Sequence, residues 1–109
     1  MRAPASQWKR SARAPMDELL LSKIRLGAIA ELLTAEWMTF PALQKAIGTT
    51  QGNLGAHLGK LVDAGYVSEE KMFVDRRPQT RYRLTKKGRS AFADHVREMQ
   101  AILKHGRVS

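Results

Sequence analysis

The side chains best suited to chemistry in this chain are basic, and they gather in two segments. Four of the 19 lysines and arginines lie in residues 1–15, which hold no acid, and eight lie in residues 71–89 beside a single acid, Asp75. These segments carry +4 and +7, whereas the remaining residues hold seven bases and nine acids. Clustered charge of one sign attracts a polyanion. The alternative, a solvated charged face, does not explain the nearly neutral remainder.

Residue types that many enzymes need are scarce in these 109 residues. The chain has no cysteine and three histidines, which excludes disulfides, thiolate metal sites and cysteine nucleophiles. No glycine-rich phosphate loop follows a strand. No run approaches the roughly 20 apolar residues of a membrane span, and residues 1–15 lack the apolar centre of a secretory signal. We therefore expect one cytoplasmic domain with no enzymatic activity, no cofactor and no membrane partner.

Hydrophobic periodicity and capping residues predict the elements that position the bases. Residues 1–15 form a flexible basic arm, and residues 16–109 form the domain. Thr39, Thr50 and Thr85 are expected helix caps, and Gly48 is expected to end a helix. The expected helices span 17–35, 40–47, 51–64 and 86–104, a short extended piece lies at 37–39, and strands span 66–74 and 80–85.

Two of these helices are joined by a short turn, and a hairpin follows them. The hairpin tip is expected at residues 75–79, where Pro78 favours a loop. The predicted fold is mainly α with a small β-hairpin. Its order of helix, strand, helix, helix, strand, wing, strand and helix is that of a winged helix-turn-helix.

Three segments of the sequence resemble MarR- and ArsR-like winged-helix transcriptional regulators. They are the first-helix segment 22–29, the recognition-helix segment 49–67 and the wing segment 73–89. The resemblance covers about residues 17–104 and is closest to compact one-domain members of the family. It implies a dimeric, sequence-specific regulator of transcription that binds double-stranded DNA, most often as a repressor.

A recognition helix contacts base edges through the outward side chains near its N-terminus. Because Leu54 and Leu58 must face the core, the expected base-contacting residues are Gln51, Asn53, Ala56 and His57. Glutamine and asparagine can each form two hydrogen bonds with adenine. The alternative for Gln51 and Asn53 is simple solvation near a helix cap. The residues expected at the DNA backbone beside this helix are Lys45, Thr50 and Lys60.

The hairpin and the arm supply the remaining expected DNA contacts. Arg76 and Arg77 are predicted to enter the minor groove. Arg81 and Arg83 share one side of a strand and are predicted to contact the DNA backbone, with ordinary exposed charge as the alternative. The arm bases Lys9, Arg10 and Arg13 either reach an adjacent groove or belong to a plain tail.

The last helix carries an apolar stripe with helical spacing, made of Phe92, Val96, Met99 and Leu103. The leucines and isoleucines of the preceding helices already close a three-helix core. We therefore expect the stripe to pack against a second copy, the alternative being its own domain. A two-fold dimer predicts a pseudo-palindromic operator with half-sites about one helical turn apart.

Three glycines, Gly52, Gly55 and Gly59, lie on one strip of the expected recognition helix. Each costs about 1 kcal/mol relative to alanine in a helix interior. Either the strip lets the backbone approach DNA or another helix closely, or this helix is simply of marginal stability.

A metal-sensor hypothesis rests on Asp94, His95 and His105, which resemble the interfacial zinc site of some ArsR-like sensors. The chain departs from that pattern because its acid and histidine are adjacent, and adjacent side chains diverge by about 100° on a helix. We therefore expect no metal and solvated histidines. No residue identifies a small-molecule effector. A winged helix with an architectural or protein-binding role is the alternative function, and RNA binding is disfavoured by an aromatic content of 6%.

Overall fold

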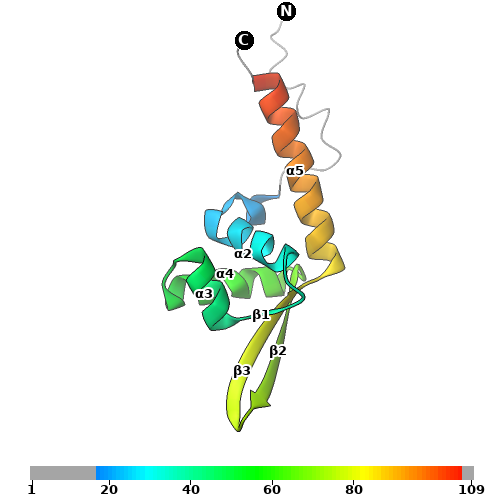
Figure 1. Cartoon of the computed structure of the whole chain (residues 1–109). Helices are drawn as coiled ribbons and strands as arrows, with labels where there is room; N and C mark the ends of the chain where they lie inside the picture. The colour runs from blue at the N-terminus through cyan, green and yellow to red at the C-terminus, as the bar shows by residue number, and fades with distance from the viewer. Residues whose placement is uncertain (1–16, 107–109) are drawn as a thin grey trace, which may run out of the picture.

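A computed structural model describes residues 17–106 of the chain. Within them, four α-helices and a small antiparallel sheet confirm the predicted winged helix-turn-helix, and α5 and the hairpin extend from opposite ends of the helical body (Figure 1). The elements are the 3₁₀-helix η2 (Glu18–Leu21), α2 (Lys23–Leu33), β1 (Met38–Thr39), α3 (Phe40–Ile47), α4 (Gln51–Asp63), β2 (Val67–Val74), β3 (Arg77–Leu84) and α5 (Lys86–Gly106).

Side-chain caps define the helix-turn-helix formed by α3 and α4. The hydroxyl oxygens of Thr39 and Thr50 accept hydrogen bonds from the third backbone N–H that follows each of them. Gly48 ends α3 with φ 75° and ψ 40°, a left-handed conformation that glycine adopts without steric cost. The predicted caps and the predicted end of the first of these helices are confirmed.

The expected continuous helix over residues 17–35 is wrong, because the chain breaks at Ser22. Ser22 is extended, with φ −97° and ψ 128°, and its side chain accepts from the N–H of Arg25 to begin α2. Asp17 likewise caps the short η2. Serine side chains compete with helical backbone bonds in this way, and the break lets Leu20 enter the core. At the other end, α2 stops at Leu33 with Thr34 as its C-cap.

The core lies between the helices and one face of the sheet. The strand order is β1-β3-β2, and β2 and β3 pair over their whole lengths, with Val67 opposite Leu84 and Glu69 opposite Tyr82. Side chains alternate between the faces of a strand, and the inward ones join the helical leucines. The buried apolar residues are Leu20, Ala28, Ile29, Leu32, Leu43, Leu54, Leu58, Leu61, Val67, Tyr82 and Leu84.

The hairpin turn is tighter than the five-residue tip expected from the sequence. Only Asp75 and Arg76 form the turn, both at positive φ (51° and 65°), and β3 starts at Arg77. Positive φ at both central positions is typical of a type I′ turn, which matches the twist of the strands. Pro78 therefore lies in β3 opposite Phe73, not in a loop. Its missing N–H is tolerated because β1 pairs only with residues 81 and 82, leaving the outer edge of β3 open there.

The start of α5 is fixed by a close approach of backbones. Thr85 caps the helix, as expected, by accepting from the N–H of Gly88, and its hydroxyl donates to the carbonyl of Gly65 at 2.6 Å. A Cβ at Gly88 would lie 2.1 Å from the carbonyl oxygen of Tyr66. Only glycine fits at this junction, which sets the direction in which α5 leaves the body.

Candidate nucleic-acid interface

The N-terminal end of α4 presents polar side chains to solvent. Gln51, Asn53 and Ala56 are exposed, whereas Leu54 and Leu58 are buried as expected. Thr50, whose hydroxyl accepts from the N–H of Asn53 at 3.1 Å, is also exposed. Exposure leaves three of the four predicted base-contacting residues accessible to a duplex. The predicted phosphate-contacting lysines, Lys45 and Lys60, are exposed too.

His57, the fourth predicted base-contacting residue, is only partly exposed to solvent and contacts α2. Arg25 donates from Nη1 to Nδ1 of His57 at 2.8 Å and from Nε to the carbonyl oxygen of Leu19 at 2.6 Å. Burial, then the positive charges of Arg25 and Lys60, lower the pKa of His57 below its usual value. The imidazole is therefore neutral at pH 7, with Nδ1 as acceptor and the proton on Nε2. This contact could not be predicted from local sequence patterns, because its partners lie 32 residues apart.

The strip formed by Gly52, Gly55 and Gly59 faces open space. A Cβ built on any of the three would meet no atom within 4 Å. Close packing within the described residues therefore does not require these glycines. The outer surface of α4 is left without side chains along this strip.

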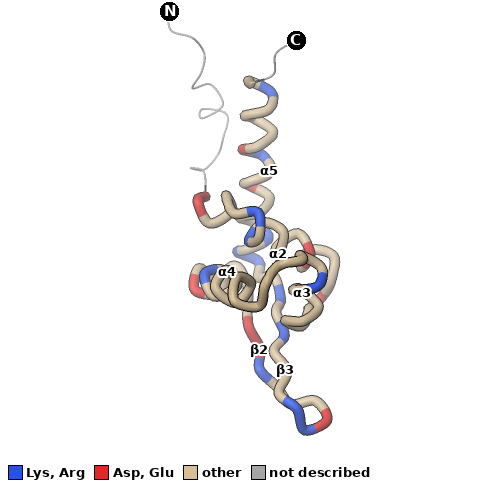
Figure 2. Tube along the Cα trace, turned by 90° about the vertical axis from the view of Figure 1, so that its left-hand side faces the viewer, with Lys and Arg blue, Asp and Glu red and all other residues tan. Residues whose placement is uncertain are grey.

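The turn of the hairpin carries two neighbouring bases beside one acid (Figure 2). Arg76 and Arg77 are exposed, as a contact with DNA requires. Arg76 also holds a φ of 65°, which costs an arginine free energy that glycine would avoid. The turn thus retains a strained basic residue at the point of the hairpin farthest from the core.

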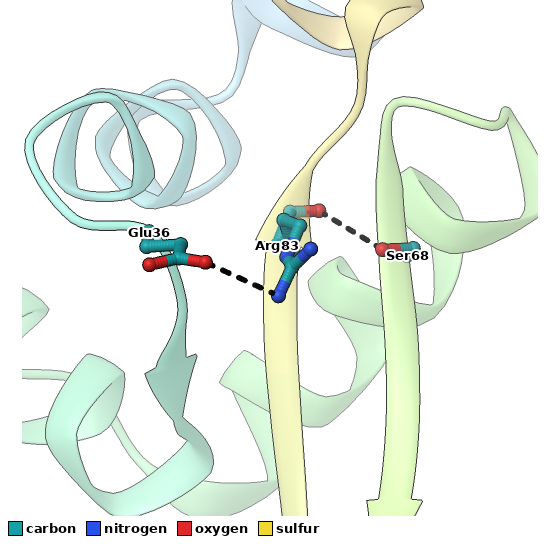
Figure 3. A network of polar contacts seen from close by, with 3 residues as sticks. All are labelled: Glu36, Ser68 and Arg83. Atoms are coloured by element: carbon teal, nitrogen blue, oxygen red, sulfur yellow. Dashed lines mark hydrogen bonds and ion pairs between the residues drawn. The ribbon is translucent and has the colours of Figure 1, made fainter.

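Arg81 and Arg83 lie on the face of the sheet opposite the helices. The guanidinium of Arg81 stacks 3.8 Å from the ring centre of Trp37, and its Nε donates to the Oε1 of Gln79 at 3.0 Å. Figure 3 shows Arg83 reaching Glu36, with 3.8 Å between Nη2 and Oε1, while its carbonyl oxygen accepts from Ser68. The two arginines border a hollow of about 90 Å³ that is lined by Trp37, Ser68, Glu70, Arg81, Tyr82 and Arg83. Their role at the DNA backbone stays a prediction.

The α5 stripe is exposed over most of its length. Phe92 is half-buried and packs on the core, whereas Val96, Met99 and Leu103 are exposed, Leu103 by 66%. The part of the chain that the structure describes therefore leaves most of the stripe uncovered. The arm residues Lys9, Arg10 and Arg13 lie outside the described residues.

The expectation of solvated histidines is wrong for His95. His95 is only 5% exposed and Glu98, about one turn further along α5, only 2%, and both lie about 90° around the helix from the stripe. Nδ1 of His95 and Oε2 of Glu98 have no hydrogen-bond partner. No three histidine, aspartate or glutamate side chains between residues 17 and 106 are grouped to hold a metal ion. No helix in this range could cross a membrane.

A helix-turn-helix with an exposed polar end, followed by a basic hairpin and a long terminal helix, defines a winged-helix DNA-binding domain. The family model described as a winged helix DNA-binding domain matches residues 24–103. The chain belongs to this family.

Known proteins have similar sequences or the same fold. An uncharacterised protein of Methanocaldococcus jannaschii is 33% identical over 84 residues, which cover 77% of this chain and 91% of that protein. A transcriptional regulator homologue from Pyrococcus horikoshii has the same fold, with a TM-score of 0.79 and 24% identity over 94% of this chain and 99% of the other. A MarR-family regulator from Silicibacter pomeroyi is 25% identical, with a TM-score of 0.61 over 93% of this chain and 65% of its own.

Proposed function

We propose that this protein is a sequence-specific regulator of transcription that binds double-stranded DNA as a homodimer and acts as a repressor in the cytoplasm. The observation that carries this proposal is the exposed N-terminal end of α4, with Gln51 and Asn53, on a helix that is followed along the chain by a basic hairpin. Side-chain amides supply hydrogen bonds that discriminate between bases, and arginines supply affinity for phosphates. An enzymatic role has no comparable support.

The alternative is an architectural winged helix that binds DNA without choosing a sequence. Basic charge on the hairpin would be enough for such binding, because phosphate contacts carry no sequence information. The two functions differ in the ratio of affinities for a preferred site and for random duplex.

The proposal is tested by selecting bound sequences from a random DNA pool and measuring the affinity for the winner and for random duplex at two salt concentrations. We expect at least a 10³-fold preference for the selected site, in the range of specific regulators. Equal affinity for both duplexes would support the architectural role, and no binding would refute both. Lys60→Ala should weaken binding to every duplex and reduce the salt slope by about one. Asn53→Ala should lower the preference for the selected site with little change in slope.

The homodimer is proposed because α5 leaves Val96, Met99 and Leu103 exposed on one stripe. Exposed apolar surface of this kind marks interaction sites. A second copy of α5 offers a matching stripe in a two-fold arrangement, in which the same patch is used on both subunits.

Sedimentation of the purified protein tests the homodimer. We expect a dimer for the wild type and a monomer for Met99→Asp, because the charge would be buried at the interface without a partner. Ser90→Asp is the matched control, since Ser90 is exposed about 180° around α5 from Met99. A monomeric wild type, or a dimer that Met99→Asp leaves intact, would overturn this arrangement.

Repression is proposed because a dimer on a promoter excludes other proteins from the same DNA. Transcription in vitro from a template that carries the selected site within a promoter should fall as the protein is added. An increase in transcript would instead assign the protein as an activator.

A further inference from the structure

Phe73 is the most exposed of the large hydrophobic residues in the described part of the chain. Its side chain is 77% exposed, although it lies in a regular strand one residue before the end of β2. A single exposed apolar residue is ordinary on a protein surface. Phe73 differs because its position and the charges around it indicate what covers it.

The strand register places Phe73 on the same side of the sheet as the helices. Phe73 lies opposite Pro78, and Val67 lies opposite Leu84. Residues an even number of positions apart share a face, so Phe73 and Pro78 continue the face whose inner part, at Val67, Tyr82 and Leu84, packs against the core. The hairpin extends past the helices (Figure 1), and this face therefore borders the space next to α4.

The charge around this apolar pair is positive. Within residues 71–78 the bases are Lys71, Arg76 and Arg77, and the single acid is Asp75. A second copy of the hairpin would bring the same charge and be repelled. A partner that is negative at its rim and apolar within complements this surface. The DNA minor groove has this character, with phosphates along its edges and sugar and base edges inside.

We propose that Phe73 and Pro78 form an apolar ridge that enters the minor groove next to the major groove occupied by α4, together with Arg76 and Arg77. This proposal rests on the proposed binding of double-stranded DNA. Apolar side chains of minor-groove proteins commonly wedge between base steps and partly unstack them. Phe73 then contributes affinity that is independent of salt, whereas the arginines contribute affinity that salt weakens.

The test compares Phe73→Ala with Val74→Ala on the selected DNA site. Val74 is the matched control, because it is apolar, adjacent and 37% exposed but lies on the opposite face of the hairpin. We expect Phe73→Ala to weaken binding about tenfold with an unchanged salt slope, and Val74→Ala to change it less than twofold. Arg77→Ala should lower the salt slope by about one. Phe73→Leu should keep most of the affinity.

A fluorescent base reports the contact directly. 2-Aminopurine placed at successive steps of the minor groove beside the half-site should brighten on binding of the wild type and stay dim with Phe73→Ala. If the wild type binds the selected site specifically and Phe73→Ala binds it with the same affinity and the same salt slope, the apolar ridge is overturned and the proposed function stands. A change in sedimentation of Phe73→Ala without a change in DNA affinity would assign Phe73 to contacts between copies. A wild type that binds no duplex would refute both proposals.

Discussion

Arg25 joins three segments of the chain through one guanidinium. The guanidinium donates to the carbonyl oxygen of Leu19 in η2 and to Nδ1 of His57 in α4. The backbone N–H of Arg25 donates to the hydroxyl oxygen of Ser22. The position of α4 relative to the first helix therefore depends on a polar contact as well as on the core. Tyr66 adds a second link, because its hydroxyl donates to Asp17, and this hydrogen bond, with burial, raises the pKa of Tyr66 to about 12.

The lowered pKa of His57 predicts a stability that depends on pH. Because the folded protein disfavours the imidazolium more than the unfolded chain does, the free energy of unfolding should fall as the pH drops through 6.5 towards the folded pKa. Above pH 6.5 both states are neutral at this site and the contribution is constant. Urea unfolding at pH 7.5, 6.5 and 5.5 measures the effect. His57→Asn, which keeps an uncharged acceptor, should remove part of the pH dependence, and an identical dependence in both proteins would contradict the contact with Arg25.

The close packing around Gly88 predicts that even a small side chain at this position lowers the free energy of unfolding. Gly88→Ala would place a methyl group 2.1 Å from the carbonyl oxygen of Tyr66 and 2.8 Å from Cδ1 of Leu84. Relief requires a shift of the backbone, which typically costs about 1–3 kcal/mol. Thermal unfolding of Gly88→Ala should show this loss. Wild-type stability in this variant would mean that α5 starts with a different geometry.

At the scale of elements, α4 combines a well-packed inner face with a bare outer strip. Replacing glycine by alanine in the interior of a helix removes backbone entropy from the unfolded chain, and nothing obstructs a methyl group here. Gly55→Ala and Gly59→Ala should therefore each raise the free energy of unfolding by about 1 kcal/mol in urea titrations. A loss of stability would show that the strip packs against something.

The DNA affinity of the same two variants decides between the two explanations of the glycine strip, which are close approach of the helix backbone to DNA and marginal stability of the helix. Unchanged affinity with raised stability would mean that α4 is simply a helix of marginal stability. Weaker binding to the selected site, with unchanged Asn53 and Lys60, would mean that the bare backbone approaches DNA closely.

The elements themselves show what the sequence can predict. Caps at Thr39, Thr50 and Thr85 and the left-handed Gly48 act over three or four residues, so local patterns predicted α3, α4 and the start of α5. The break at Ser22 was missed because a serine within an apolar periodic run suits both a helix interior and a cap, and burial of Leu20 decides between them. The two-residue turn was missed because Pro78 favours a loop locally, whereas pairing with Phe73 places it in β3.

The candidate interface was predictable only in part, for a similar reason. Exposure of Gln51 and Asn53 follows from the helical period once Leu54 faces the core. The contact of Arg25 with His57, the stacking of Arg81 on Trp37 and the burial of His95 depend on segments that are distant in sequence. The proposed role of Phe73 depends on the register of the hairpin with the core.

At the scale of the whole molecule, the positive charge is concentrated in one part of the structure. The described body carries little net charge, and the bases concentrate from the hairpin to the start of α5 (Figure 2). In the proposed function, a recognition helix of low charge and a basic segment that runs from the hairpin to the start of α5 separate the two tasks of a DNA-binding protein. We propose that the helix distinguishes bases and that the basic segment holds the DNA backbone.

Hydroxyl-radical footprinting on the selected site tests this account most directly. Two copies related by two-fold symmetry should protect two half-sites about 10 base pairs apart, or a multiple of that spacing, with further protection in the minor groove outside each half-site where the wings lie. Arg76→Ala combined with Arg77→Ala should remove the outer protection and keep the inner. A single protected patch, or protection that does not change in the double variant, would contradict the account.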